Sequence, residues 1–206
     1  AHQNGMKVIL DWIGNHTAWD NAWVSAHPDW YTGPQTGDEQ QWADVTFLNY
    51  NKPAVCDAMQ DAMLYWVDEA DVDGYRCDYA HGVPIDFWTK VNTEIFKRKK
   101  DAIMLAETSD VRLCNAGFNL LYSWSYMYAI EGLYKGTGTF ASVLSASKSE
   151  YESTPKGCER MRYVTTHDET SQVAPATVFR TAQGELSAFC LTIFMGGVPM
   201  IYSSQD

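Results

Sequence analysis

Short, mainly apolar runs recur along the chain, and each of them ends at a polar or charged residue. Runs of this length and character are typical of strands that are buried on both faces of a parallel sheet. The pattern therefore predicts a sheet of six parallel strands. The runs lie at residues 6–10, 72–77, 102–106, 118–122, 161–165 and 198–202.

The segments between these runs carry apolar residues at three- and four-residue steps, which is the spacing of one helix face. Four helices are predicted in this way: one from Pro53, one after Pro84, one from Phe140 and one over residues 186–193. Strands that alternate with helices form βα units, and such units build a parallel sheet. We therefore expect an α/β fold.

Residues 16–52 follow neither pattern, and loops of this length inside a compact domain usually have a function. Aromatic side chains crowd this part of the chain, and their flat rings suit the apolar faces of sugars, although about half are expected to be loop core. We expect 16–52 to be a short inserted loop domain. The aromatic residues in this segment and just before it are Trp12, Trp19, Trp23, Trp30, Tyr31 and Trp42.

Composition narrows the classes of function. The chain has 206 residues, enough for one domain with a sizeable core. Its formal net charge is −11, whereas proteins that bind a phosphate backbone carry the opposite balance, so no nucleic-acid partner is expected. No apolar run reaches about 18 residues, so no membrane partner is expected either. The cysteines form no Cys-x-x-Cys pair, which argues against a zinc cluster or a redox motif.

Three carboxylates follow three separate predicted strands, which is where barrel enzymes place their chemistry. A single carboxylate at a strand end is most often a helix cap or a loop hydrogen-bonder. Three together, without a nucleophile elbow, an HExxH motif or a Gly-rich phosphate loop, favour cleavage of a glycosidic bond. The carboxylates are Asp78, Glu107 and Asp168, and they are accompanied by His16, Arg76 and His167.

Four short motifs at these strand ends resemble those of the α-amylase family, which comprises retaining enzymes that act on α-glucans. Residues 11–16 (Asp-Trp-Ile-Gly-Asn-His) resemble the first motif, and residues 74–78 (Gly-Tyr-Arg-Cys-Asp) resemble the second. Residues 105–107 (Leu-Ala-Glu) and 166–168 (Thr-His-Asp) resemble the third and fourth. Residues 197–202 are similar to the last barrel strand of the family. Each motif alone is weak, but their order over the whole chain makes a strong signal.

The resemblance implies a role for each matching residue. Asp78 would be the nucleophile, Glu107 the general acid and base, and Asp168 the group that holds sugar hydroxyls. Two carboxylates perform this chemistry without a cofactor. Substrate contacts are implied for His16, Arg76, His81 and His167.

The residue chemistry fits these implied roles. Arg76 lies two residues before Asp78 on the same strand face, and its positive charge favours an ionised carboxylate. Glu107 must begin protonated, which requires a partly desolvated site near other carboxylates. Asp11 is expected to pair with Arg76 and to be structural.

Two departures from the family pattern leave substrate preference and metal dependence open. Thr166 stands where the family often has Asn. Residues 79–82 read Tyr-Ala-His-Gly, where many α-amylases have Ala-Ala-Lys-His, so His81 occupies the Lys position. The Asn of the first motif often binds a structural calcium ion in this family, which makes Asn15 the candidate metal ligand, although the sequence shows no complete oxygen cage.

The function implied is hydrolysis of α-1,4-glucosidic bonds in starch or maltooligosaccharides, with retention through a covalent glycosyl-enzyme. The partner is then an α-glucan oligosaccharide or polysaccharide. Alternatives are a transglycosylase, a family member that acts on α-1,6 bonds, pullulan or cyclodextrins, or a sugar-binding barrel without catalysis. The chain itself does not indicate a compartment, but a polymeric substrate implies a secreted or periplasmic parent enzyme.

The fold implied is a (β/α)8 TIM barrel that is incomplete here. Motif order makes the six runs strands three to eight, with the irregular insertion 16–52 after the third strand. Residues 1–206 are therefore expected to form a partial catalytic barrel that is inactive alone.

Overall fold

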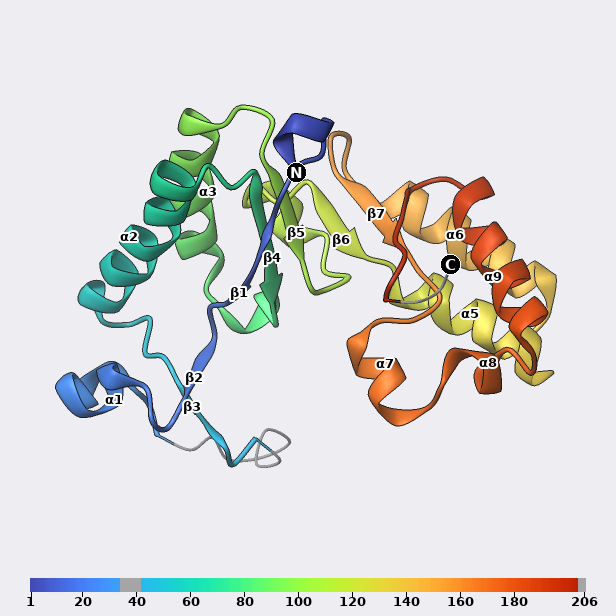
Figure 1. Ribbon diagram of the computed structural model, residues 1–206, viewed down its shortest axis with the longest axis horizontal. Coiled ribbons are helices and arrows are strands. Elements are labelled where there is room, and N and C mark those ends of the chain that lie inside the picture. Colours follow the sequence, from blue (N-terminus) through green and yellow to red (C-terminus); the bar gives the residue numbers. More distant parts are fainter. Residues whose placement is uncertain (34–41, 204–206) are drawn as a thin grey trace. The chain divides into compact units, whose positions relative to one another are not determined.

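The computed structural model describes residues 1–33 and 42–203, in which strands alternate with helices along the chain (Figure 1). The chain divides into two units, Ala1–Phe118 and Asn119–Asp206, and each is described here by itself. Each unit contains three parallel strands. The predicted α/β class and its six parallel strands are confirmed.

In the first unit, β4 (Gly74–Asp78) lies between two parallel neighbours, β1 (Leu10–Ile13) and β5 (Ile103–Ala106). The register places Asp11 beside Arg76 on the first pair and Leu105 beside Arg76 on the second. The helices α2 (Pro53–Ala70) and α3 (Ile85–Arg98) follow β3 (Val45–Phe47) and β4 and lie next to each other beside this sheet (Figure 1). The helical elements of the unit are η1 (His2–Asn4), α1 (Ala22–Ala26), η2 (Pro28–Trp30), α2 (Pro53–Ala70), η4 (Ala80–Gly82), α3 (Ile85–Arg98) and α4 (Arg112–Asn115).

Close packing fixes how the strands of the first unit meet. Gly74 has φ +142°, and a Cβ on it would lie 1.9 Å from the carbonyl oxygen of Ile103, so no larger residue fits where β4 meets β5. On the helix side of β4, the hydroxyl of Tyr75 donates to the carbonyl of Met63 in α2 at 2.5 Å. Because side chains alternate along a strand, Arg76 and Asp78 then share the opposite face.

The segment between β1 and α2 contains a small antiparallel ribbon, β2 (His16–Ala18) with β3 (Val45–Phe47). Within the loop, the Trp30 ring stacks on His27 at 4.1 Å and meets the edge of Trp23 at 5.2 Å. These aromatic rings therefore pack within the loop itself. Residues 34–41 of the predicted inserted domain lie outside the described residues, and the assignment of 16–52 as a domain stays a prediction.

The second unit has the strand order β6 (Leu120–Tyr122), β7 (Glu159–Arg162) and β8 (Val198–Pro199). Its apolar core joins α5 (Trp124–Lys135) and α6 (Phe140–Ser153) to the residues that follow β7 and to the two helices before β8. The buried members of this core are Tyr126, Ile130, Val143, Val164, Phe179 and Ala188. The helices are α5 (Trp124–Lys135), α6 (Phe140–Ser153), α7 (His167–Gln172), α8 (Pro175–Val178) and α9 (Ala182–Phe194).

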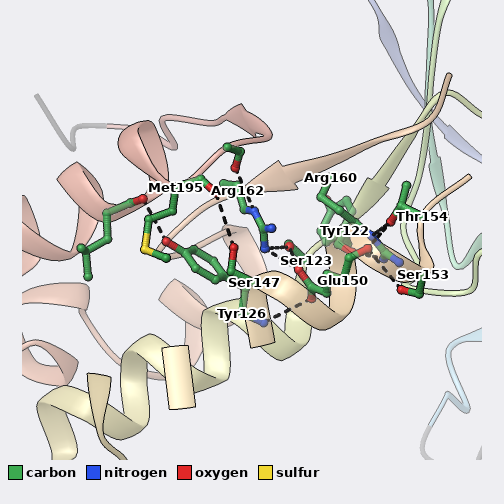
Figure 2. Close-up of polar contacts among 12 residues, drawn as sticks. Tyr122, Ser123, Tyr126, Ser147, Glu150, Ser153, Thr154, Arg160, Arg162 and Met195 are labelled. Atoms are coloured by element: carbon green, nitrogen blue, oxygen red, sulfur yellow. Dashed lines mark hydrogen bonds and ion pairs between the residues drawn. The ribbon is translucent and has the colours of Figure 1, made fainter. Parts of the chain in front are cut away.

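A buried polar cluster attaches β7 to α5 and α6 (Figure 2). Arg162 is 3% exposed and pairs with Glu150, which is 6% exposed. The guanidinium also donates to the hydroxyl of Ser123 at 2.5 Å and lies 4.2 Å from the ring centroid of Tyr126. The Tyr126 backbone N–H completes the cluster by donating to Glu150 at 3.2 Å.

The predicted elements need several corrections. The strand predicted over 6–10 is β1, which begins only at Leu10 and runs to Ile13. The strand predicted over 198–202 is β8, which ends at Pro199. The strand predicted over 161–165 is β7, which starts two residues earlier and ends at Arg162, because buried arginines pair inside the structure and interrupt the apolar run. Helix α5 was not predicted: it contains several aromatics and a glycine, which are weak helix formers, and burial of Tyr126, Met127 and Ile130 stabilises it instead.

In the part of the chain that the structure describes, no helix has the length and apolar character needed to cross a membrane.

Candidate active site

One buried guanidinium joins three carboxylates in the first unit. Arg76 Nη1 donates to Asp11 Oδ1 at 2.9 Å and to Asp78 Oδ1 at 2.7 Å. Its Nη2 lies 3.0 Å from Glu107 Oε1. Adjacent strands explain the arrangement, because β1, β4 and β5 place these residues next to one another at the same edge of the sheet. The predicted pairing of Asp11 with Arg76 is confirmed.

The cluster carries more negative than positive charge. Three carboxylates share one guanidinium, and solvent access differs among them: the Asp11 side chain is 59% exposed, Asp78 24% and Glu107 15%. Charges are poorly screened where water is limited, so this site attracts positive charge. A cationic transition state such as an oxocarbenium ion is stabilised in such surroundings.

Glu107, directly after β5, is held at both oxygens. Arg76 pairs with Oε1, and the backbone N–H of Tyr79 donates to Oε2 at 2.7 Å. Both donors favour the ionised carboxylate. The protonated starting form of Glu107 therefore stays a prediction. Sequence reasoning missed the contribution of Tyr79, because a backbone donor leaves no residue-type signal.

His16 in β2 lies among aromatic rings of the long loop. Its ring centroid is 5.5 Å from Trp42 and 5.9 Å from Phe47. Burial lowers the pKa of His16, although the negative charges of Asp78 and Asp44 act to raise it. A neutral imidazole has one donor and one acceptor nitrogen, which suits it to sugar hydroxyls.

His81 lies in η4, just after Asp78 and Tyr79. It is exposed, and its ring centroid is 4.1 Å from that of Tyr79. The Trp42 ring meets Tyr79 edge-on at 4.8 Å from another side. The predicted substrate residues His16 and His81 thus lie on one aromatic cluster with Trp42 and Tyr79.

Asn15, the candidate calcium ligand, lies directly before His16 at the start of the long loop. It is buried, with its amide nitrogen 3.5 Å from His16 Nδ1. Across residues 1–33 and 42–203, no group of three His, Cys, Asp or Glu is arranged to hold a metal ion. A calcium site at Asn15 stays a prediction.

The fourth motif lies in the second unit and opens a helix. Thr166 is the N-cap of α7: its hydroxyl accepts from the Asp168 N–H at 3.2 Å, and Glu169 accepts from the Thr166 N–H at 2.9 Å. His167 Nε2 is 3.4 Å from Asp168 Oδ1, and both side chains are about half-exposed. Asp168 is therefore a first-turn residue of a helix, several residues beyond the end of β7. Thr-x-x-Glu is a capping-box signature that was visible in the sequence, and it explains Thr166.

The comparisons with known proteins agree with these motifs. The family described as "Alpha amylase, catalytic domain" matches residues 39–206. The chain belongs to the α-amylase family. It is similar to alpha-amylase MalA of Haloarcula japonica, with 28% identity over 221 residues that cover 100% of this chain and 32% of that protein. It is also 30% identical over 128 residues to the intracellular maltogenic amylase of Bacillus subtilis, covering 52% of this chain and 21% of the relative.

Solved structures show the same fold. The maltogenic alpha-amylase AmyB of Thermotoga neapolitana matches with a TM-score of 0.86 and 28% identity, over 99% of this chain and 48% of that one. An alpha-amylase of Lactobacillus plantarum matches with a TM-score of 0.87 and 27% identity, over 100% and 52%. The chain thus spans about a third of the first curated relative and about half of these structures. The predicted partial (β/α)8 barrel is confirmed.

Proposed function

We propose that the protein containing this chain hydrolyses α-1,4-glucosidic bonds of starch or maltooligosaccharides with retention of configuration. The observation that carries the proposal is the contact of one buried guanidinium with Asp11, Asp78 and Glu107. Two of these carboxylates match the family's nucleophile and acid/base. The wider family membership supports an α-glucan as the substrate.

The proposed reaction has two steps. In the first, an oxygen of Asp78 bonds to the anomeric carbon while the glycosidic bond breaks, and Glu107 gives its proton to the leaving oxygen. In the second, water attacks that carbon, loses a proton to Glu107 and releases Asp78. Arg76 contacts the Asp78 carboxylate that attacks and that is released again in the second step. The contact of Arg76 with Glu107 loosens when Glu107 takes up a proton.

The remaining motif residues are assigned to binding. His16 and His167 hydrogen-bond hydroxyls of the sugar whose bond is cut, and Asp168 holds adjacent hydroxyls as the ring flattens. His81 contacts sugars on the leaving-group side. These assignments follow the family motifs and the chemistry of the side chains.

Two substitutions in the full-length protein test the roles. Asp78→Asn should abolish turnover of maltooligosaccharides and leave starch binding largely intact. Glu107→Gln should abolish turnover of natural glucans yet spare part of the first step on an aryl glycoside whose good leaving group needs no proton. Equal losses of Glu107→Gln activity on both substrates would contradict its role as the acid.

The stereochemistry of the first product tests retention. Proton NMR during early hydrolysis of a maltooligosaccharide should show the α-anomer before mutarotation, and the β-anomer would show inversion instead. In the same samples, products longer than the substrate indicate transglycosylation. Parallel assays on pullulan and cyclodextrins test the other alternative, because cleavage of these substrates alone indicates another specificity.

A further inference from the structure

The tyrosine that follows Asp78 has a backbone conformation that few residues other than glycine adopt. Tyr79 has φ 42° and ψ 45°, in the left-handed region. We propose that Tyr79 is a positioning residue for Glu107: packing around its ring holds this conformation, and the conformation holds its backbone N–H against the Glu107 carboxylate. The inference deepens the proposed function, on which it rests for the role of Glu107.

The backbone contact is direct. The Tyr79 N–H donates to Glu107 Oε2 at 2.7 Å, which is a short, charge-assisted hydrogen bond. On the other side of the same turn, the Tyr79 carbonyl accepts the N–H of Gly82 at 2.9 Å. Arg76 fixes the second oxygen of Glu107, so rotation of the carboxylate is restricted by both neighbours. An acid that transfers a proton to one oxygen of the substrate depends on this orientation.

Contacts of the ring stabilise the left-handed turn. Trp42 meets the Tyr79 ring edge-on at 4.8 Å, and His81 lies at 4.1 Å from its centroid. Trp42 itself stacks on Phe47 at 5.9 Å with an interplanar angle of 2°, and Phe47 is buried in β3. A left-handed non-glycine residue costs free energy that surrounding contacts must supply, and this aromatic cluster supplies it.

Because Gly82 has no side chain, the Tyr79 ring can occupy the space beside it. A Cβ at position 82 would lie 2.5 Å from Cδ1 and Cε1 of Tyr79 and 2.6 Å from Oδ1 of Asn15. A side chain at 82 and the ring at 79 therefore exclude each other. Tyr79 and Gly82, which both depart from the Ala-Ala-Lys-His pattern, are therefore sterically compatible with each other.

The experiment compares two substrates of the full-length protein. Natural maltooligosaccharides need proton donation in the first step, and an aryl maltooligosaccharide with a good leaving group does not. For Tyr79→Ala and for Gly82→Ala, we expect the ratio of kcat/KM on the natural substrate to that on the aryl substrate to fall about tenfold. Tyr79→Phe keeps the ring and should keep the wild-type ratio. Tyr65→Ala, which removes a tyrosine that is 58% exposed on α2, is the matched control and should not change the ratio.

A double substitution tests the coupling between the two positions. In Tyr79→Ala the ring is gone and only the close approach to Asn15 remains at position 82, so adding Gly82→Ala should lower the ratio by less than it does in the wild-type protein. An unchanged ratio in either single variant, or equal losses on both substrates, would overturn the inference. So would additive losses in the double variant.

A readout without turnover separates this inference from the proposed function. In full-length protein labelled with 15N-tyrosine, the Tyr79 amide proton resonance should shift in Glu107→Gln and in Gly82→Ala. If no α-glucan is hydrolysed but these shifts occur, the proposed function fails and the positioning contact stands. If the resonance moves in neither variant, the positioning inference is wrong even in an active enzyme.

Discussion

At the scale of single residues, the site depends on how Arg76 divides its donors. A guanidinium is planar and carries five N–H groups in a fixed fork, so Nη1 and Nη2 can contact different carboxylates at the same time. Here Nη1 donates hydrogen bonds to Asp11 and Asp78, while Nη2 forms the ion pair with Glu107. A lysine ammonium is a single point of charge and cannot reproduce this division.

Arg76→Lys therefore tests the guanidinium rather than the charge. The variant keeps the positive charge but loses the simultaneous contacts, so we expect kcat/KM on maltooligosaccharides to fall by about 10²–10³-fold, as when one preorganised donor is removed. Arg98→Lys is the control, because Arg98 pairs with Asp68 at 3.0 Å on the surface and such pairs contribute little. Comparable losses in both variants would contradict a specific role for Arg76.

At the scale of elements, the apolar runs indicated where the strands lie. Buried charged residues made the predicted bounds of one strand, β7, wrong. The runs ending at Asp78 and Glu107 predicted the ends of β4 and β5 to within a residue. The bounds of β7 were wrong, because Arg160 and Arg162 are buried through partners in other elements. The left-handed turn at Tyr79 was also beyond prediction, since its cause is tertiary packing of the ring rather than local sequence.

The pair between β7 and α6 gives a prediction of stability. Glu150→Gln leaves the guanidinium of Arg162 buried without a compensating charge, so we expect the full-length protein to lose about 3–5 kcal/mol in its free energy of unfolding. Glu152→Gln is the control, because Glu152 is an exposed carboxylate that pairs with Lys148 at 3.7 Å on the surface of the same helix. It should change the free energy of unfolding by less than about 0.5 kcal/mol. Denaturant unfolding measures both, and a similar small change in the two would show that the buried pair is not needed.

The capping box of α7 gives a second prediction at this scale. Thr166→Ala should cost about 1 kcal/mol of stability, because the N-cap hydroxyl is lost. Thr139→Ala removes the equivalent cap of α6, where Thr139 accepts the N–H of Ser142 at 3.3 Å, and should cost a similar amount. Because α7 carries His167 and Asp168, only Thr166→Ala should also raise KM for maltooligosaccharides. Equal KM values in the two variants would contradict a binding role for the start of α7.

At the scale of the whole molecule, the terminal strands of the chain are only partly paired. Within residues 1–33 and 42–203, β1 pairs with β4 alone and β8 pairs with β7 alone. Large apolar side chains are exposed on and near β8: Phe194 is 83% exposed, Val198 43% and Ile201 58%. Unpaired strand edges and exposed apolar residues both promote association between chains.

Residues 1–206 expressed alone are therefore expected to associate and to lack hydrolytic activity, whereas the full-length protein should be monodisperse and active. Fully burying a side chain such as Phe or Ile contributes about 1.5–3 kcal/mol, and a domain is stable by only about 5–15 kcal/mol, so several exposed residues of this kind outweigh the margin. The family relatives are also about two to three times as long as this chain. Size-exclusion chromatography, a thermal melt and a starch-hydrolysis assay on both proteins measure the difference. A monomeric, sharply melting and active chain of 206 residues would show that these strands and this site suffice on their own.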